Sequence, residues 1–204
     1  NVPMVRRDEG DDRLELWLGE PGKSGPIGLA GRALLLGVLA LLTAGFVRNG
    51  LNAEHLGGSF LHLVNLPFHE AGHVLFSPFG RFMMTLGGSL LQVIVPIVCA
   101  VVFLTKTRDP FAASAALWWA GQSLMDLAPY IADARALQLV LLGGRTGAEV
   151  EGHDWEYILQ TLGWLHRDVA LGNAAFMTGA VVMVGGLAWG GAVVVRQFRS
   201  QRMP

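Results

Sequence analysis

The sequence is poor in charged residues. Asp, Glu, Lys and Arg together make up 15% of its 204 residues, and 52% are hydrophobic, whereas about 25% of the residues of a soluble domain are charged. The 15 basic residues are balanced by 16 acidic ones, so the chain lacks the basic excess of a nucleic-acid-binding protein. These shortages exclude nucleic acid as an expected partner and favour membrane lipid as the main surroundings of the chain.

Cysteine is almost absent as well. Cys99 is the only one, which excludes a disulfide within the chain and a metal site built from several thiolates. There is no internal repeat with a period of about 20–50 residues. No short apolar stretch with a small-residue cleavage site directly follows the polar first residues, so we expect no classical signal peptide. The natural expectation is one domain.

The chain is rich in long apolar runs. A run of about 20 residues is enough for a helix to cross the roughly 30 Å core of a bilayer. The candidate runs cover residues 27–47, 60–79, 86–104, 111–142 and 169–195. Residues 153–167 instead show the apolar spacing of an amphipathic helix. The sequence therefore predicts an all-α fold, a polytopic transmembrane helix bundle of about five spans with one amphipathic interfacial helix.

The two ends of the chain differ from this middle part. We expect residues 1–26 to form a polar N-terminal tail and residues 196–204 a basic C-terminal tail, on either side of a transmembrane domain over residues 27–195. The distribution of Lys and Arg leans weakly toward a cytoplasmic C-terminus. We expect an integral membrane protein of the bacterial inner (plasma) membrane.

The run at 60–79 contains the motif His69-Glu70-Ala71-Gly72-His73. Residues four apart lie on one face of a helix, so both imidazoles can bind the same metal ion. Glu70 is offset by one position, from which its carboxylate can take a proton from a water activated by zinc. The alternative is a histidine pair hydrogen-bonded within the bundle. Because ionisable residues in apolar segments are costly and usually functional, we predict a Zn²⁺ site with Glu70 as catalytic base.

A catalytic zinc usually has three protein ligands and one open position. The candidates for the third ligand are Asp126 and Asp133, His62, and the pair His153 and Asp154. Four of these five candidates also have another interpretation. His62 would bond to a neighbouring helix, Asp126 would orient a metal-bound histidine, Asp154 would cap a helix N-terminus, and His153 would be an exposed loop residue.

Two amides in the apolar runs are further candidates. Asn65 lies one helical turn before His69, and Gln92 follows Gly87-Gly88-Ser89. Either side chain could contact a substrate. The alternative for both is a hydrogen bond between neighbouring helices, which is a common use of Asn and Gln within a membrane.

The motif Phe68-His69-Glu70-Ala71-Gly72-His73 inside a transmembrane helix resembles the site-2 protease family of intramembrane zinc metallopeptidases. That family has a second motif with an asparagine, a proline and a ligand aspartate in a later span. Here Asp126, Pro129 and Asp133 occupy a similar layout. The resemblance implies that Asp133 is the third zinc ligand beside the two histidines and that Glu70 is the base.

The resemblance and the motif together predict a zinc metalloendopeptidase, a hydrolase that cleaves membrane-spanning or membrane-proximal segments of transmembrane protein substrates. An alternative is a non-proteolytic, protease-like accessory subunit of a larger membrane complex, whose partners would be other membrane subunits. Metal content and a stable complex with other membrane proteins would discriminate between the two.

Overall fold

The computed structural model describes residues 9–20 and 24–202. In these ranges every regular element is a helix, and there is no strand. The α-helices are α1 Glu9–Leu18, α2 Pro26–Asn49, α3 Ala53–Gly57, α4 Phe60–Phe76, α5 Arg81–Thr105, α6 Pro110–Ala132, α7 Asp154–Thr161 and α8 Asp168–Arg202, with short 3₁₀ turns at Ser77–Phe79 and Leu165–Arg167. The predicted all-α fold is confirmed.

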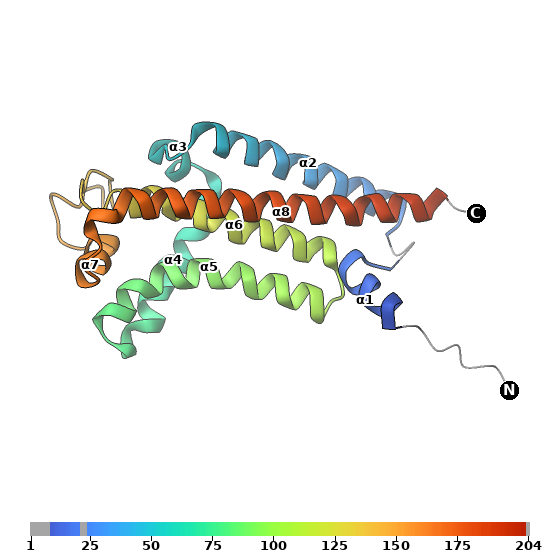
Figure 1. The fold of residues 1–204 in the computed structure, drawn as a ribbon, viewed down its shortest axis with the longest axis horizontal. Coiled ribbons are helices and arrows are strands. Elements are labelled where there is room, and N and C mark those ends of the chain that lie inside the picture. The colour runs from blue at the N-terminus through green and yellow to red at the C-terminus, as the bar shows by residue number, and fades with distance from the viewer. Residues whose placement is uncertain (1–8, 21–23, 203–204) are drawn as a thin grey trace.

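Helix α8, with 35 residues, runs along the whole length of the molecule (Figure 1). Helix α6 packs along it through small residues that let the two backbones touch. A Cβ atom added to Gly121 would lie 2.7 Å from the carbonyl oxygen of Gly179, and one added to Gly179 would lie 2.6 Å from that of Gly121. This close contact makes α6 and α8 the central pair of the bundle.

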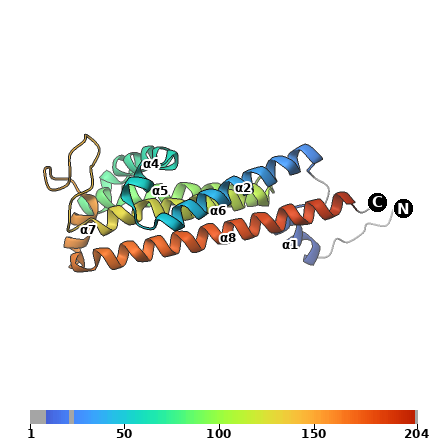
Figure 2. The ribbon, with the colours of Figure 1, turned by 90° about the horizontal axis from the view of Figure 1, so that it is seen from above.

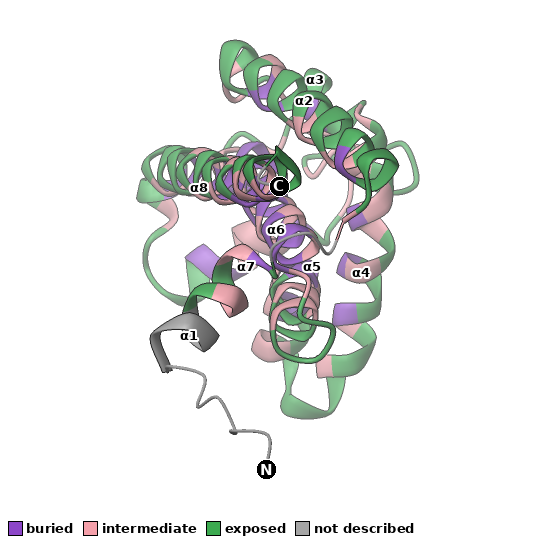
Figure 3. Cartoon of the chain, turned by 90° about the vertical axis from the view of Figure 1, so that its right-hand side faces the viewer, coloured by how far each residue is buried: buried purple, intermediate pink, exposed green. Residues whose placement is uncertain are grey.

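Helices α2, α4, α5 and α8 surround α6, which carries much of the buried surface (Figure 3). The core cluster consists of Phe46, Leu56, Trp118, Met125, Ala128, Phe176 and Met183. Seen from above, α2 lies over α6 and α8, and α7 lies at the end opposite α1 (Figure 2). The core therefore joins α6 to α2, α3 and α8, and leaves α4 and α5 as a pair on the other side.

Three helical segments are long and apolar enough to cross a membrane, Pro26–Asn49, Arg81–Thr105 and Leu165–Arg202. Each leaves most of its surface exposed, as expected for contact with lipid rather than with protein. The three segments match the predicted runs at 27–47, 86–104 and 169–195. Helices α4, with 17 residues, and α6, with 23, are not among them, so five spans are not confirmed.

The structure corrects several predicted boundaries. Helix α6 passes through Pro129 but ends at Ala132, and residues 133–153 form an irregular segment before α7. The amphipathic helix is short, since α7 covers only eight residues. The predicted N-terminal tail includes α1, where Trp17 packs against Trp189 with ring centroids 5.5 Å apart. Residues 1–8 and 21–23 of that tail lie outside the described residues, and the predicted C-terminal tail continues α8 as far as Arg202.

Helices α4 and α5 form a tight hairpin that places the histidine motif against α5. Gly72 faces Gly87 across this contact, so closely that a Cβ atom on either residue would collide with the backbone of the other. The short glycine-to-glycine approach brings the side chains at neighbouring positions of α4 close to the start of α5. The motif therefore lies between two helices and not on a free helix surface.

Candidate metal centre

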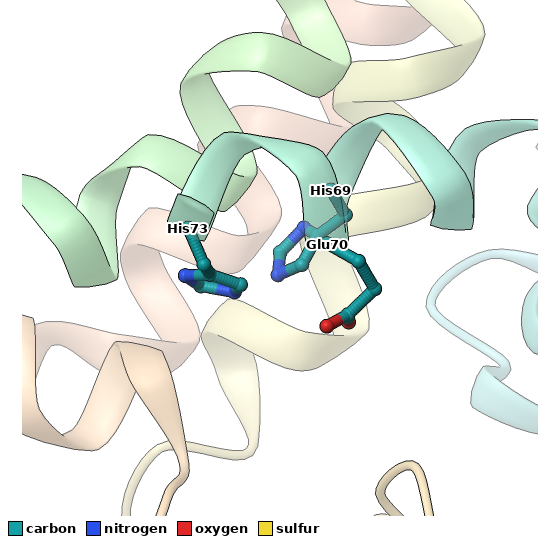
Figure 4. Close-up of side chains that lie close together, drawn as sticks. All are labelled: His69, Glu70 and His73. Carbon is teal, nitrogen blue, oxygen red and sulfur yellow. The ribbon is translucent and has the colours of Figure 1, made fainter. Parts of the chain in front are cut away.

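The three ionisable residues of the motif project from one side of α4 (Figure 4). Each of the three residues offers one atom that could bind a metal, and these atoms of His69, Glu70 and His73 all lie within 4.8 Å of one another. The two imidazole rings have centroids 4.9 Å apart. The helical spacing predicted from the sequence thus produces the expected convergence of the rings, with the carboxylate of Glu70 beside them.

Both imidazoles are oriented by hydrogen bonds through Nδ1. His69 Nδ1 donates to Oε1 of Gln92 at 3.0 Å, and His73 Nδ1 donates to the carbonyl oxygen of Met84 at 2.9 Å. Since both partners can only accept, the proton of each neutral ring must lie on Nδ1. The lone pairs of both Nε2 atoms then remain available, which is the arrangement of a metal-binding histidine.

Asp154, at the start of α7, places a carboxylate oxygen, a third possible metal-ligand atom, next to these two nitrogens. Its Oδ2 lies 3.2 Å from Nε2 of His69 and 3.3 Å from Nε2 of His73. Ligand atoms about 2.0–2.1 Å from a tetrahedral zinc are about 3.3 Å apart, so both distances fit ligands that share one ion. Without an ion, a proton on Nε2 would let an imidazole pair with this carboxylate; with both rings neutral and Nδ1 protonated, three acceptor atoms face one another and a divalent cation takes the place of that proton.

Gly88 leaves room where the two nitrogens converge. A Cβ atom added at this position would lie 2.6 Å from Nε2 of His73 and 2.7 Å from Nε2 of His69, closer than real contacts allow. The missing side chain lets both rings pack directly against the backbone of α5, with their Nε2 atoms close together. Two imidazoles and one carboxylate are a donor set that fits a divalent zinc ion.

The site opens into a cavity of about 720 Å³, a volume typical of sites that bind small molecules or short peptide segments. Its polar lining consists of His62, His69, Glu70, His73, Thr85, Gln92, Asp126, Tyr130 and Asp154. Leu63 and Leu66 on α4 and the stretch 139–142 of the irregular segment add an apolar wall. A substrate could therefore reach Glu70 and the histidines along a largely apolar surface.

The carboxylate of Asp154 is held in its ionised form. Burial acts to raise the pKa of this group, but its short contacts with the imidazoles of His69 and His73, when these carry a proton on Nε2, outweigh burial and hold the pKa below its usual value. Asp154 is fixed from its backbone too, since its N–H donates to Oη of Tyr130 at 2.9 Å. An ionised carboxylate is the form that binds a metal.

Helix α7, which carries Asp154, is docked onto α5. Trp155 Nε1 donates to Oγ of Ser89 at 3.2 Å. The guanidinium of Arg81 lies 4.4 Å from the ring centroid of Tyr157. These two contacts hold the start of α7 over the part of α5 that faces the histidines.

Asp133, which the resemblance favoured as the third ligand, lies elsewhere. Its carboxylate accepts hydrogen bonds from the backbone N–H groups of Gln138 and Leu139 at 3.0 and 2.9 Å. Its Oδ2 is also 3.5 Å from Nε2 of His153. Besides Glu70, the carboxylate next to the histidine pair is that of Asp154, one of the predicted alternatives, which takes the place of Asp133 as the candidate third ligand.

The simpler interpretations of His153 and Asp154 are wrong. His153, and not Asp154, caps α7, because its Nδ1 accepts a hydrogen bond from the backbone N–H of Glu156 at 3.2 Å. His153 is only 2% exposed, so it is not a surface loop residue. Burial lowers the pKa of its imidazole and favours the neutral ring.

Asp126 is the centre of a buried network between α4, α5 and α6. It accepts hydrogen bonds from Nδ1 of His62, Nδ2 of Asn65 and Nε2 of Gln92, each at 3.1 Å. The expected helix-to-helix bond of His62 is confirmed. Asp126 orients His69 only indirectly, since Gln92 lies between them. Gln92 lines the cavity but is only 3% exposed and is bonded to His69, Ser123 and Asp126, and Asn65 is 1% exposed and bonded to α6. Both amides therefore make the hydrogen bonds between helices that were their alternative interpretation.

Sequence reasoning did not single out Tyr130, Met84 or Gly88. Gly88 belongs to a Gly-Gly pair, which indicates close backbone approach, but the pattern does not show what approaches. No family model, curated protein or solved structure matches this chain. The family resemblance therefore stays a prediction, and the geometry of the site supports the functional proposal.

Proposed function

We propose that the protein is a zinc-dependent endopeptidase that works within or at the edge of a membrane. His69, His73 and Asp154 would hold the Zn²⁺ ion, and Glu70 would be the catalytic base. The observation that carries the proposal is the convergence of two Nε2 atoms on one carboxylate oxygen, at 3.2 and 3.3 Å, beside a further carboxylate.

The proposed reaction is hydrolysis of a peptide bond. A bound zinc ion would supply Lewis acidity and make a water molecule more acidic. The carboxylate of Glu70, exposed toward the cavity, takes the proton from the attacking water and passes it to the leaving amine. Gln92 and the carbonyl of Met84 keep the two imidazoles in the required tautomer during this step.

The membrane setting narrows the substrate to apolar or membrane-proximal peptide segments. We propose that α4 and α6 also lie within the bilayer, which gives about five spans, and that the membrane is the bacterial inner membrane. The apolar runs of both helices support this, as does the exposure of Phe60, Val74 and Leu75 on α4. Such a substrate must unwind locally to expose its peptide bond, because a helix hides its backbone.

Replacing Glu70 with Gln tests the proposed base. The variant should keep its zinc, because the three ligands are unchanged, and should cleave about 10²–10⁴-fold more slowly than the wild type. The measurement is cleavage of quenched-fluorescent membrane-spanning peptides in vesicles, together with zinc content. Glu54→Gln, on the exposed side of α3, is the matched control and should behave as the wild type.

Two outcomes separate the proposals. Wild-type cleavage rates in Glu70→Gln would contradict the role of this carboxylate. A wild-type protein that binds zinc but cleaves none of the peptides would favour the alternative, an accessory subunit that keeps the metal site without turnover.

A further inference from the structure

The segment between α6 and α7, residues 133–153, brings Asp154 to the histidine pair. We propose that Asp133, His153 and Tyr130 form a latch that closes the base of this segment and thereby positions Asp154 for the metal. The latch rests on the metal site proposed above. It makes Asp133 a positioning residue, whereas the second motif had suggested a ligand.

One side of the latch is the end of α6. Asp133 stands directly after the helix and accepts hydrogen bonds through both carboxylate oxygens from the backbone of Gln138 and Leu139. The N–H of Leu137 also donates to the carbonyl oxygen of Asp133 at 2.8 Å. These bonds fold the first residues of the segment back onto the end of α6.

The other side is His153 at the start of α7. Its Nδ1 accepts from the N–H of Glu156, so its proton lies on Nε2. That Nε2 is fully buried and makes no hydrogen bond, and the Oδ2 of Asp133 lies 3.5 Å away. A buried donor without a partner is costly, so its approach to an ionised carboxylate joins the two ends of the segment electrostatically.

Tyr130 connects this pair to the metal site. Its ring centroid lies 4.3 Å from that of His153, in a tilted contact. Its Oη accepts the backbone N–H of Asp154, and its ring centroid is 6.2 Å from that of His69. Tyr130 therefore packs against His153 on one side, and on the other side it holds the backbone of Asp154, the proposed third ligand.

Packing inside the segment supports the same closed form. The N–H of Ala148 donates to the carbonyl oxygen of Leu137 at 3.1 Å, which pairs the two halves of the segment. Gly147 lies so close to His153 that an added Cβ would be 3.2 Å from its ring. A long flexible connection would lower the effective concentration of Asp154 at the histidines, and the latch removes much of that freedom.

The test uses the full chain in detergent, stripped of metal, with Zn²⁺ affinity measured by competition against a chromophoric chelator. Tyr130→Phe removes only the oxygen that binds Asp154. His153→Asn keeps an acceptor for the cap of α7 but removes the ring and its Nε2–H. Each should weaken Zn²⁺ binding about 10–100-fold, the usual effect of losing a group that orients a ligand.

Matched controls and a second measurement separate positioning from folding. Tyr157→Phe, which keeps the ring beneath Arg81, and His166→Asn, at an exposed site, should leave the affinity unchanged. At saturating Co²⁺ the visible spectrum of Tyr130→Phe should equal that of the wild type, because its ligands are intact. Asp154→Asn should change that spectrum, because it removes a ligand.

The results distinguish the latch from the metal site itself. If Asp154→Asn weakens binding but Tyr130→Phe and His153→Asn stay within about twofold of the wild type, well below the usual tenfold or more, the latch is overturned and the site stands. If Asp154→Asn binds Zn²⁺ as tightly as the wild type, the metal site and the latch both fall. A latch variant that melts earlier without metal but binds Zn²⁺ normally when folded would also overturn the latch.

Discussion

Gly88 faces the histidine rings across the contact between α4 and α5. A methyl group there would lie within 2.7 Å of both Nε2 atoms, so Gly88→Ala should displace the rings or fill the space between them. We expect Zn²⁺ affinity to fall by at least about tenfold, although every donor is kept. Metal competition with the purified protein measures this.

The control for this substitution is Gly45→Ala on α2, where nothing lies within 4 Å of an added Cβ. It should bind zinc as the wild type does. Equal affinities for Gly88→Ala and the wild type would show that the ion does not bind beside α5.

Gln92 sets the tautomer of His69. Removing its side-chain amide should lower the Zn²⁺ affinity although all proposed metal ligands are kept. Gln92→Leu removes the acceptor for Nδ1 of His69, so the proton can move to Nε2 and block the lone pair. Zn²⁺ affinity should fall about 10–100-fold. Gln160→Leu, on the exposed side of α7, is the matched control, and a wild-type affinity in Gln92→Leu would contradict this role.

Single residues also show where sequence reasoning succeeds and where it fails. His69, Glu70 and His73 could be predicted because their geometry follows from the helical period alone. Asp154 lies 85 residues beyond His69, and its approach depends on a folded connection that no local pattern encodes. Asp133 fitted the spacing of a known motif, but in the structure its carboxylate accepts the backbone N–H groups of Gln138 and Leu139.

Among the helices, α2, α5 and α8 were predicted closely because lipid-facing segments are apolar without interruption. The end of α6 was missed, since its apolar run continues to about residue 142 while the helix ends at Ala132. Helices α4 and α6 pass through Pro67 and Pro129, so neither proline ends its helix. Helix α7 was predicted too long because its apolar rhythm continues into a 3₁₀ turn.

The close contact between helices α6 and α8 gives a prediction about stability. Gly121→Ala would bring a methyl group to 2.7 Å from the carbonyl oxygen of Gly179, which must push the helices apart. We expect a loss of about 1–3 kcal/mol in the free energy of unfolding, seen as a lower melting temperature in detergent.

Gly185→Ala on α8 is the matched control, since nothing lies within 4 Å of its added Cβ. It should keep the wild-type melting temperature or raise it, because Ala favours helices over Gly. If both variants melt alike, the close α6–α8 contact is not present in the protein.

For the molecule as a whole, the arrangement predicts which parts lie on opposite sides of the membrane. Helix α8 runs from the end with α7 and the candidate metal site to the end at which α1 lies (Figure 1). If α8 spans the bilayer, Arg145 and Arg199, both exposed, lie on opposite sides.

Because Cys99 is the only cysteine, Cys99→Ser provides a background for single-cysteine labelling. In that background Arg145→Cys and Arg199→Cys should react with a membrane-impermeant reagent from opposite sides of intact vesicles. Reaction of both from the same side would mean that α8 does not cross. The side that labels Arg145→Cys is also the side to which the metal site lies closer.

The order of the donors along the chain has a consequence during synthesis. His69 and His73 leave the ribosome first, and Asp154 follows 85 residues after His69, a delay of roughly 4–17 s at translation rates of about 5–20 residues per second. Until then a nascent chain would hold only two of the three proposed protein ligands of the zinc ion. If the chain is the protease proposed above, it would be inert toward neighbouring polypeptides that are being inserted beside it until Asp154 has been translated and has reached the histidines.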